Sequence, residues 1–425
     1  MNHFQPKGGA LFCEDVPLSR IAAAVGTPAY IYSTATLERH FEVFRSALAD
    51  HPNLGAPLIA YAVKANGNLS VLATLARLGA GADTVSQGEI RRALAAGVPP
   101  GRIVFSGVGK TADEIAFALA AGVCQINIES PPELALVSSL AAAAGARPAI
   151  AVRVNPDVAA GGHAKISTGR SASKFGVSMA EAEDLYARAH ADPNLEAVGV
   201  ACHIGSQIAD LAPLEAAFGL MRGLVERLRA RGLPVGRLDL GGGLGVPYFS
   251  QPDPPGPAAF AAMASRAVGG LGLTLAFEPG RVIAANAGVL LARVIHVHAR
   301  EDGRRFVVVD AAMNDLIRPA MYDAFHDIRP VTPRAGDVRA FDVVGPVCES
   351  GDTFAQDRRL APLIAGDLVA FMTAGAYGAV MASEYNSRLL VPEVLVRGAD
   401  FAVVRPRPTY EEMLARESRA PWLGA

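Results

Sequence analysis

A lysine follows directly after a run of apolar residues in the segment Tyr61-Ala62-Val63-Lys64-Ala65-Asn66. Burying an ammonium group is costly, and burial lowers the pKa of an amine. The neutral amine is the form that attacks a carbonyl to give a Schiff base. The ordinary alternative is a lysine with a buried stem and an amine that reaches water. This segment alone favours neither interpretation.

Two glycine-bearing segments follow apolar runs much later in the chain. One is Gly241-Gly242-Gly243-Leu244-Gly245, and the other is Glu278-Pro279-Gly280-Arg281. Glycine lets the backbone approach a phosphate closely, so that N–H groups can bind it. The first segment is not a dinucleotide fingerprint, because G-x-G-x-x-G would require glycine at Val246. A tight turn is the alternative for either segment taken alone.

A Schiff-base lysine together with phosphate loops predicts pyridoxal phosphate as the cofactor. Glu278 supplies the electronic argument. A carboxylate against the pyridine nitrogen keeps that nitrogen protonated, and the ring then becomes a strong sink for the electrons left by loss of CO2. An arginine at this point would weaken the sink and favour reprotonation, as in a racemase. The acid here therefore favours decarboxylation.

Several further polar residues are candidates for the site, although each of them taken alone has an ordinary structural explanation. His203, in His203-Ile204-Gly205-Ser206-Gln207, could stack on the cofactor ring, with Ser206 reaching the phosphate. His296 and His298 resemble metal ligands, but two histidines on one strand without a third ligand are more simply incidental. Gly109-Lys110-Thr111 imitates the end of a P-loop but lacks the required glycine at position 104.

The last third of the chain carries candidates for substrate contacts. Cys348 and Glu349 follow a strand-like run and Gly-Pro, and a thiol there could return a proton to the carbon that loses CO2. Glu349 could bind a distal ammonium group of the substrate. Arg318 is suited to bidentate binding of a carboxylate, with Tyr322 one turn away. Tyr377 lies between glycines and could contact the ring or phosphate.

Eight short apolar runs alternate with Ala/Leu-rich helical segments. The runs are Leu58–Val63, Ala82–Val85, Ile103–Phe105, Cys124–Ile128, Ala149–Val154, Val198–Cys202, Arg237–Leu240 and Leu273–Phe277. Such runs are typical of parallel strands covered on both faces. Eight units predict a (β/α)8 barrel, in which active sites lie at the carboxyl ends of the strands.

The alternation stops after about Ala285, and β-rich runs bounded by turn residues follow. We expect an α/β protein with a TIM-type barrel followed by a mostly antiparallel β domain. The expected boundaries are residues 1–33 for an N-terminal segment contributing to the β domain, 34–285 for the cofactor-binding barrel, and 286–425 for the C-terminal β domain.

Bulk composition excludes several classes of partner. The net charge is −2, from 39 basic and 41 acidic side chains, so nothing favours nucleic acid or an anionic membrane. No stretch approaches ~18 uncharged apolar residues, and the N-terminus lacks a signal-peptide core. The four cysteines show no metal spacing and are expected to be free thiols. We expect a cytoplasmic enzyme that binds a small-molecule substrate.

The chain resembles the diaminopimelate decarboxylases, pyridoxal phosphate enzymes of the alanine-racemase-like fold group, from about Thr27 to Leu390. The matching blocks are Tyr61–Asn66, Gly107–Thr111, His163–Gly176, His203–Gln207, Gly241–Gly245, Glu278–Arg281, Asn314–Tyr322, Cys348–Asp352 and Ala374–Gly378.

This resemblance implies a role for each matching residue. Lys64 would be the pyridoxal phosphate lysine and Cys348 the proton donor. The cofactor-binding residues would be Lys64, Asp83, His203, Ser206, Gly243, Glu278, Gly280, Arg281 and Tyr377. The substrate-binding residues would be Arg281, Arg318, Tyr322, Glu349 and Tyr377.

The same resemblance implies the reaction and the assembly. The reaction would convert meso-2,6-diaminopimelate to L-lysine and CO2, the last step of lysine biosynthesis. The enzyme would be a homodimer with shared active sites, in which Cys348 and Glu349 come from the partner subunit.

Other activities within this fold remain as alternatives. A decarboxylase of ornithine, arginine or carboxynorspermidine is the first, although ornithine has no distal carboxylate to pair with Arg318. A racemase is disfavoured by Glu278. A non-catalytic pyridoxal phosphate-binding barrel would lack the large β domain expected after Ala285.

Overall fold

The computed structural model describes residues 2–159, 173–248 and 253–423. These residues form two compact units, one of Leu37–Ala285 and one that joins the N-terminal residues up to Thr36 with the chain from Asn286 onward. The first unit contains one sheet, and the second contains a large sheet and a separate three-stranded sheet of N-terminal residues.

The first unit is a closed barrel of eight parallel strands. Its sheet order is β9-β11-β12-β13-β5-β6-β7-β8, and β8 pairs back with β9 to close it. The strands are β5 (Leu58–Ala62), β6 (Gly81–Thr84), β7 (Ile103–Phe105), β8 (Gln125–Ile128), β9 (Ala149–Asn155), β11 (Glu196–Ala201), β12 (Arg237–Asp239) and β13 (Thr274–Phe277). A two-residue strand, β10 (Val177–Ser178), pairs in parallel with the end of β9. The barrel fold is confirmed.

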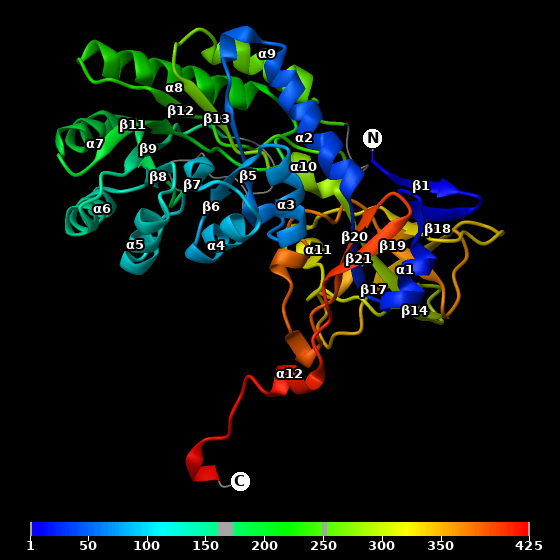
Figure 1. The fold of residues 1–425 in the computed structure, drawn as a ribbon. Coiled ribbons are helices and arrows are strands. Elements are labelled where there is room, and N and C mark those ends of the chain that lie inside the picture. Colours follow the sequence, from blue (N-terminus) through cyan, green and yellow to red (C-terminus); the bar gives the residue numbers. More distant parts are fainter. Residues whose placement is uncertain (1, 160–172, 249–252, 424–425) are drawn as a thin grey trace. The chain divides into compact units, whose positions relative to one another are not determined.

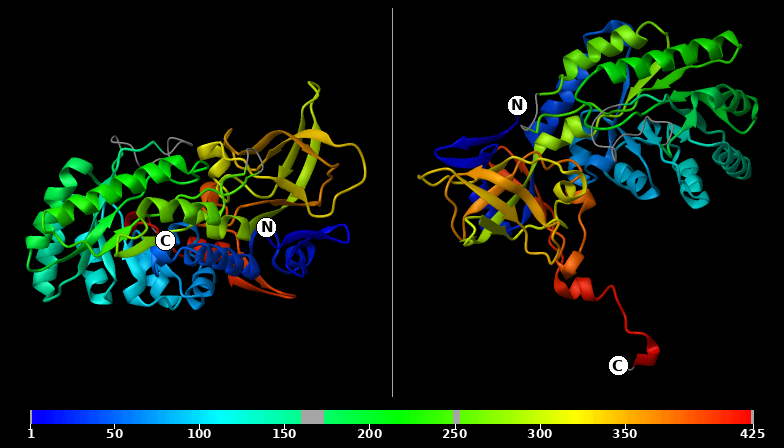
Figure 2. Two further views of the ribbon diagram at one scale, coloured as in Figure 1. Left: turned by 90° about the horizontal axis from the view of Figure 1, so that it is seen from above. Right: turned by 180° about the vertical axis from the view of Figure 1, so that it is seen from behind.

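Helices lie outside the strands of the barrel (Figures 1 and 2). They are α2 (Thr34–Ala49), α3 (Leu69–Arg77), α4 (Gln87–Ala95), α5 (Ala112–Ala121), α6 (Pro131–Ala144), α7 (Met179–Ala191), α8 (Ala212–Ala230), α9 (Pro257–Val268) and α10 (Arg281–Ala284). Several begin at a side-chain cap, as at Ser86, Thr111 and Ser178. An aromatic cluster of Phe44, Phe218, Phe260 and Phe277 packs α2, α8 and α9 against β13.

The barrel interior contains polar side chains as well as apolar ones. Gln125 donates a hydrogen bond of 2.7 Å to Asn127, and Asn127 donates one of 3.0 Å to Ser106. Gln125 also lies 3.4 Å from Asp239. All four are buried, so these bonds compensate the cost of removing them from water. They connect β7, β8 and β12 across the barrel.

The second unit is a β domain whose strands are mostly antiparallel. They are β1 (Phe4–Lys7), β2 (Ala10–Cys13), β3 (Val16–Pro17), β4 (Ala29–Ser33), β14 (Gly288–Ala299), β15 (Arg305–Val309), β16 (Ile328–Pro330), β17 (Arg339–Val344), β18 (Thr353–Leu360), β19 (Leu368–Phe371), β20 (Glu393–Arg397) and β21 (Asp400–Arg405). Two pairings are parallel, β15 with β17 and β4 with β20. The N-terminal β4 lies between β14 and β20.

The helices of this unit are short: α1 (Leu18–Val25), α11 (Arg318–Tyr322) and α12 (Tyr410–Leu414). The core packs α1 and the first strands against β4, β14 and β20, and it includes Phe4, Leu18, Ile31, Leu291 and Val394. No helix among the described residues is long and apolar enough to cross a membrane.

Candidate active site

Lys64 lies where β5 ends, in the short 3-10 turn Val63–Ala65. Its neighbours Val63 and Ala65 are buried, and its amine forms an ion pair with Asp83 at the end of β6. The Asp83 side chain is fully buried, whereas that of Lys64 is 33% exposed. A buried carboxylate is costly without a cation, so Asp83 holds the lysine amine at the carboxyl end of the strands.

Three loops meet beside Lys64 with no room for side chains. A Cβ on Gly242 would lie 2.2 Å from the Glu278 carbonyl oxygen, and one on Gly243 would lie 2.6 Å from the Gly205 carbonyl oxygen. A Cβ on Gly280 would lie 3.0 Å from the Ala62 Cβ. Gly243 also has φ of +113°, which side-chain-bearing residues rarely adopt. These glycines are therefore required by close backbone packing after β11, β12 and β13.

A cationic side chain lies at the same loops. The Arg281 guanidinium donates hydrogen bonds of 3.2 and 3.0 Å to the Ser206 hydroxyl, and one of 2.8 Å to the Tyr248 hydroxyl. Both hydroxyls can rotate to donate a hydrogen bond to an anion, and the planar guanidinium matches the geometry of a phosphate. The barrel thus brings Ser206, Gly243, Gly280 and Arg281 together in an arrangement that fits a phosphate group. Tyr248 gave no recognisable signal in the sequence.

Glu278 belongs to a group of buried carboxyls at the carboxyl ends of β6, β12 and β13. Burial, then the charges of Asp239 and Asp83, raise the pKa of Glu278 well above its usual value. Asp239 and Glu278 share a side-chain hydrogen bond. The Glu278 Oε1 atom is buried without a hydrogen-bond partner among the described residues. That oxygen fits a protonated pyridine nitrogen, which would supply both the missing donor and a positive charge.

Asp239 was not predicted from the sequence to be a site residue. Asp239 lies at the end of β12, which pairs with β13. Its Oδ1 accepts a 3.0 Å hydrogen bond from the Gly241 N–H, and the Glu278 N–H donates to the Gly241 carbonyl at 2.7 Å. These hydrogen bonds hold the glycine loop, Asp239 and Glu278 in place relative to one another. The place of Asp239 within an apolar run, two residues before Gly241, was the signal available in the sequence.

His203 is neutral and has one tautomer. Burial, then the charges of Lys64 and Arg153, hold its pKa well below the usual value. Its Nδ1 accepts a 3.2 Å hydrogen bond from the Gly242 N–H, so Nε2 carries the proton. A neutral imidazole in this position is suited to lie against an aromatic cofactor ring.

The segment that imitates a P-loop has a structural role. The Lys110 amine is buried and donates to the carbonyls of Gly107 and Asn127, at 2.7 and 2.6 Å, and to Glu133 at 2.6 Å. Thr111 caps α5 in a capping box with Glu114. The lysine amine is thus committed to the protein itself and does not serve a nucleotide.

Apart from Arg281, the substrate-contact candidates lie in the β domain. Arg318 is the first residue of α11 and is buried, whereas Tyr322, at the last position, is half-buried. Residues four apart on a helix lie on one face, so the two side chains are neighbours. Tyr377 is half-buried, with φ of +56°, in the turn after β19.

Cys348 and Glu349 occupy a turn between β17 and β18. Cys348 is exposed, and its N–H donates to the Asn386 side chain at 3.1 Å. Asp352 anchors this turn, because its buried carboxylate accepts from the N–H groups of Met313 and Val347, at 2.6 and 2.7 Å. The role of Asp352 was not foreseen. The matching block His163–Gly176 lies outside the described residues as far as position 172.

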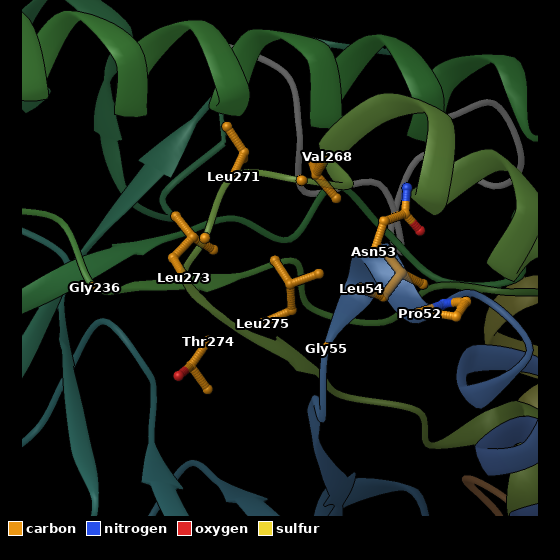
Figure 3. A pocket seen from close by; sticks show the side chains of 12 residues that line it. Pro52, Asn53, Leu54, Gly55, Gly236, Val268, Leu271, Leu273, Thr274 and Leu275 are labelled. Carbon is orange, nitrogen blue, oxygen red and sulfur yellow. The ribbon is translucent and has the colours of Figure 1, made fainter.

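Two other places lack the chemistry of an active site. A cavity of about 470 Å³ lies at the amino ends of β5, β12 and β13 and is lined by glycine backbone and uncharged side chains such as Asn53, Leu271 and Thr274 (Figure 3). Barrel enzymes act at the other end of the strands. His296 and His298 are exposed on β14, and the described residues contain no group of three or more ligand side chains suited to a metal.

Comparison with known proteins identifies the family. Residues 34–285 match the model of the pyridoxal-dependent decarboxylase, pyridoxal binding domain. Over 421 residues, which make up 99% of each chain, the chain is 49% identical to diaminopimelate decarboxylase of Zymomonas mobilis. It is 50% identical over 421 residues to that of Pseudomonas aeruginosa, covering 99% of this chain and all of the relative.

Solved structures agree with these relatives. A diaminopimelate decarboxylase from M. jannaschii superposes with a TM-score of 0.94 at 34% identity, covering 99% of both chains. One from Helicobacter pylori, complexed with L-lysine, gives 0.89 at 41% identity, covering 94% of this chain and 98% of that one. The chain belongs to the diaminopimelate decarboxylases, a family of pyridoxal-dependent decarboxylases.

Proposed function

We propose that this enzyme uses pyridoxal phosphate to convert meso-2,6-diaminopimelate to L-lysine and CO2, as the last step of lysine biosynthesis. The observation that carries the proposal is the buried Glu278 oxygen, which has no hydrogen-bond partner among the residues that the structure describes and lies near a lysine amine and three glycine loops. This combination suits a protonated pyridine ring with a phosphate tail and a carbonyl that reacts with an amine.

Each barrel residue has a distinct task in binding the cofactor. Lys64 holds it covalently, with Asp83 orienting the amine. Gly243, Gly280, Ser206 and Arg281 bind the phosphate, which fixes the ring within the barrel mouth. When bound, pyridoxal phosphate supplies the electron sink for the bond that breaks. Glu278 maintains the proton on the ring nitrogen, and the neutral His203 packs against the ring face.

The β-domain residues distinguish the substrate from other basic amino acids. Diaminopimelate carries an amine and a carboxylate at its far end. We assign Arg318 to that carboxylate, with Tyr322 beside it, and Glu349 to the far amine. Cys348 returns a proton to the carbon that has lost CO2, and Tyr377 contacts the cofactor or substrate. Ornithine leaves Arg318 without a carboxylate, so this site disfavours it.

We further propose a cytoplasmic homodimer in which Cys348 and Glu349 come from the partner subunit. The exposed position of Cys348 supports this assignment, because an exposed turn can reach another chain. All four cysteines are free, as expected for a reducing compartment.

The test is CO2 release from a panel of single amino acids. Diaminopimelate stereoisomers, lysine, ornithine and arginine are supplied separately to the pyridoxal phosphate-loaded enzyme. The proposal predicts that meso-diaminopimelate gives the highest kcat/KM, with L-lysine as the product. A higher kcat/KM for ornithine or arginine would assign the enzyme to that substrate instead.

A further inference from the structure

A buried histidine contacts the guanidinium group of Arg318. The chain turns after α11 and enters β16, and His326 lies in this turn with 1% of its surface exposed. One Arg318 nitrogen, Nη1, lies 2.9 Å from the His326 Nε2 atom. On the other side of the ring, Nδ1 lies 2.9 Å from the Met372 carbonyl oxygen. The imidazole therefore bridges the end of β19 and the arginine.

The two partners determine the protonation of the ring. A carbonyl oxygen only accepts hydrogen bonds, so the His326 Nδ1 atom carries a hydrogen. A guanidinium group only donates, so Nε2 presents its lone pair to Arg318. His326 is consequently neutral and has a single tautomer in this arrangement.

The ring is fixed by contacts that do not involve Arg318. The His326 carbonyl accepts a 2.7 Å hydrogen bond from Arg358, whose guanidinium lies 4.1 Å from the Phe325 ring centroid. The Met372 N–H donates to the Asp327 carbonyl at 2.8 Å, where β16 pairs with β19. The sheet therefore presents the Nε2 lone pair at a set position, before any ligand binds.

A neutral acceptor has an electrostatic advantage over a carboxylate in this position. Aspartate or glutamate would orient the guanidinium but would also neutralise it, which would weaken its attraction for an anionic ligand. The imidazole engages one N–H and adds no negative charge. It can restrict the rotation of a long side chain without itself cancelling the positive charge of Arg318.

We propose that His326 is a positioning residue that orients Arg318 for the distal carboxylate of the substrate, and so contributes to selectivity for a diamino diacid. This inference rests on the proposed function, because that function assigns Arg318 to the carboxylate. His326 itself does not touch the substrate.

Two substitutions separate the hydrogen bonds of the ring. In His326→Asn the amide can still donate to Met372 but is too short to reach Arg318. In His326→Gln the longer side chain can again present an oxygen to Arg318. His298→Asn, on the exposed surface of β14, is the matched control.

The measurement compares binding of two amines to the pyridoxal phosphate-loaded enzyme, followed by cofactor absorbance. L-Lysine retains the carboxylate that Arg318 is assigned to bind, and cadaverine lacks it. We expect His326→Asn to weaken L-lysine binding roughly 10-fold to 50-fold, which is typical for loss of a buried bond to a charged group. Cadaverine binding should change less than about twofold, and His326→Gln should restore most of the L-lysine affinity.

The outcomes also separate this inference from the proposed function. Equal weakening of both ligands, or none, would overturn the positioning role. Thermal unfolding and cofactor content, measured on every variant, show whether His326→Asn has simply lost its fold. In that case His326→Leu, which fills the space but accepts no hydrogen bond, replaces it: a lower ratio of L-lysine to cadaverine affinity supports the inference, and an unchanged ratio refutes it. Failure of the unsubstituted enzyme to release CO2 from diaminopimelate would refute the proposed function alone.

Discussion

Glu278→Gln tests whether the buried acid is held for the cofactor or for the fold. Glutamine preserves the size of the side chain and can donate to Asp239, but it carries no charge. Burial, then Asp239 and Asp83, raise the pKa of Glu278 in the folded protein. The folded, cofactor-free enzyme therefore binds a proton here that the unfolded chain releases.

The sign and size of the stability effect follow from this proton. The stabilisation is complete below the unfolded pKa, near 4.5, and is lost as the pH rises through the raised folded pKa. While the folded state holds one extra proton, each pH unit lowers the free energy of unfolding by about 1.4 kcal/mol. Over an experimental range of roughly pH 5.5 to 7.5, Glu278→Gln should therefore gain stability relative to the unsubstituted protein as the pH rises, by at most about 1.4 kcal/mol per pH unit.

The assay is urea unfolding of the cofactor-free proteins across that pH range. Glu133→Gln is the control, because Glu133 has a buried cationic partner, Lys110. That variant should lose about 3 kcal/mol or more at every pH. In the loaded enzyme, Glu278→Gln should lower kcat for CO2 release about 100-fold to 1000-fold. If Glu278→Gln destabilises the cofactor-free protein near pH 7.5 as Glu133→Gln does, the reasoning is refuted.

Three other experiments give independent checks. Arg318→Met should lower kcat/KM for diaminopimelate about 100-fold or more while leaving cofactor absorbance unchanged, and equal loss of cofactor binding would contradict its assigned role. Mixed heterodimers of inactive Lys64→Ala and Cys348→Ala subunits should regain CO2 release, and purified heterodimers without activity would refute shared sites. Gly242→Ala places a Cβ about 2.2 Å from a carbonyl oxygen and should weaken pyridoxal phosphate binding at least tenfold, measured by equilibrium titration. The control Gly109→Ala, which has open space around the new Cβ, should leave that affinity unchanged. Equal affinities of the two variants would show that the loop adapts.

The barrel could be predicted from sequence because its strands are buried on both faces. The segment Leu58–Ala62, for example, is apolar throughout and forms β5. In the β domain, β18 buries only Phe354 and Leu360 and carries Gln356, Asp357 and two arginines between them, so its strand was not recognised. After Ala285, the strands β16, β18 and β20 were not recognised, whereas β17 is the strand-like run that precedes Cys348.

The site was predictable where a residue type alone limits the chemistry, and less so where distant residues cooperate. Lys64 and Glu278 follow strands, and the structure places both at the carboxyl ends of the barrel. Asp239 acquires its role only through the pairing of β12 with β13. His326 contacts Arg318 only because β16 pairs with β19. The assigned roles of Arg318 and the other contact residues stay predictions.

The attachment of pyridoxal phosphate to Lys64 is the central claim, and covalent labelling tests it most directly. The loaded enzyme is reduced with borohydride and digested, and the modified peptide is sequenced by mass spectrometry. We predict that the cofactor is found on the peptide containing Tyr61–Asn66, at Lys64, and that Lys64→Ala retains no covalent cofactor. Attachment at another lysine, or retention of label by Lys64→Ala, would contradict the account.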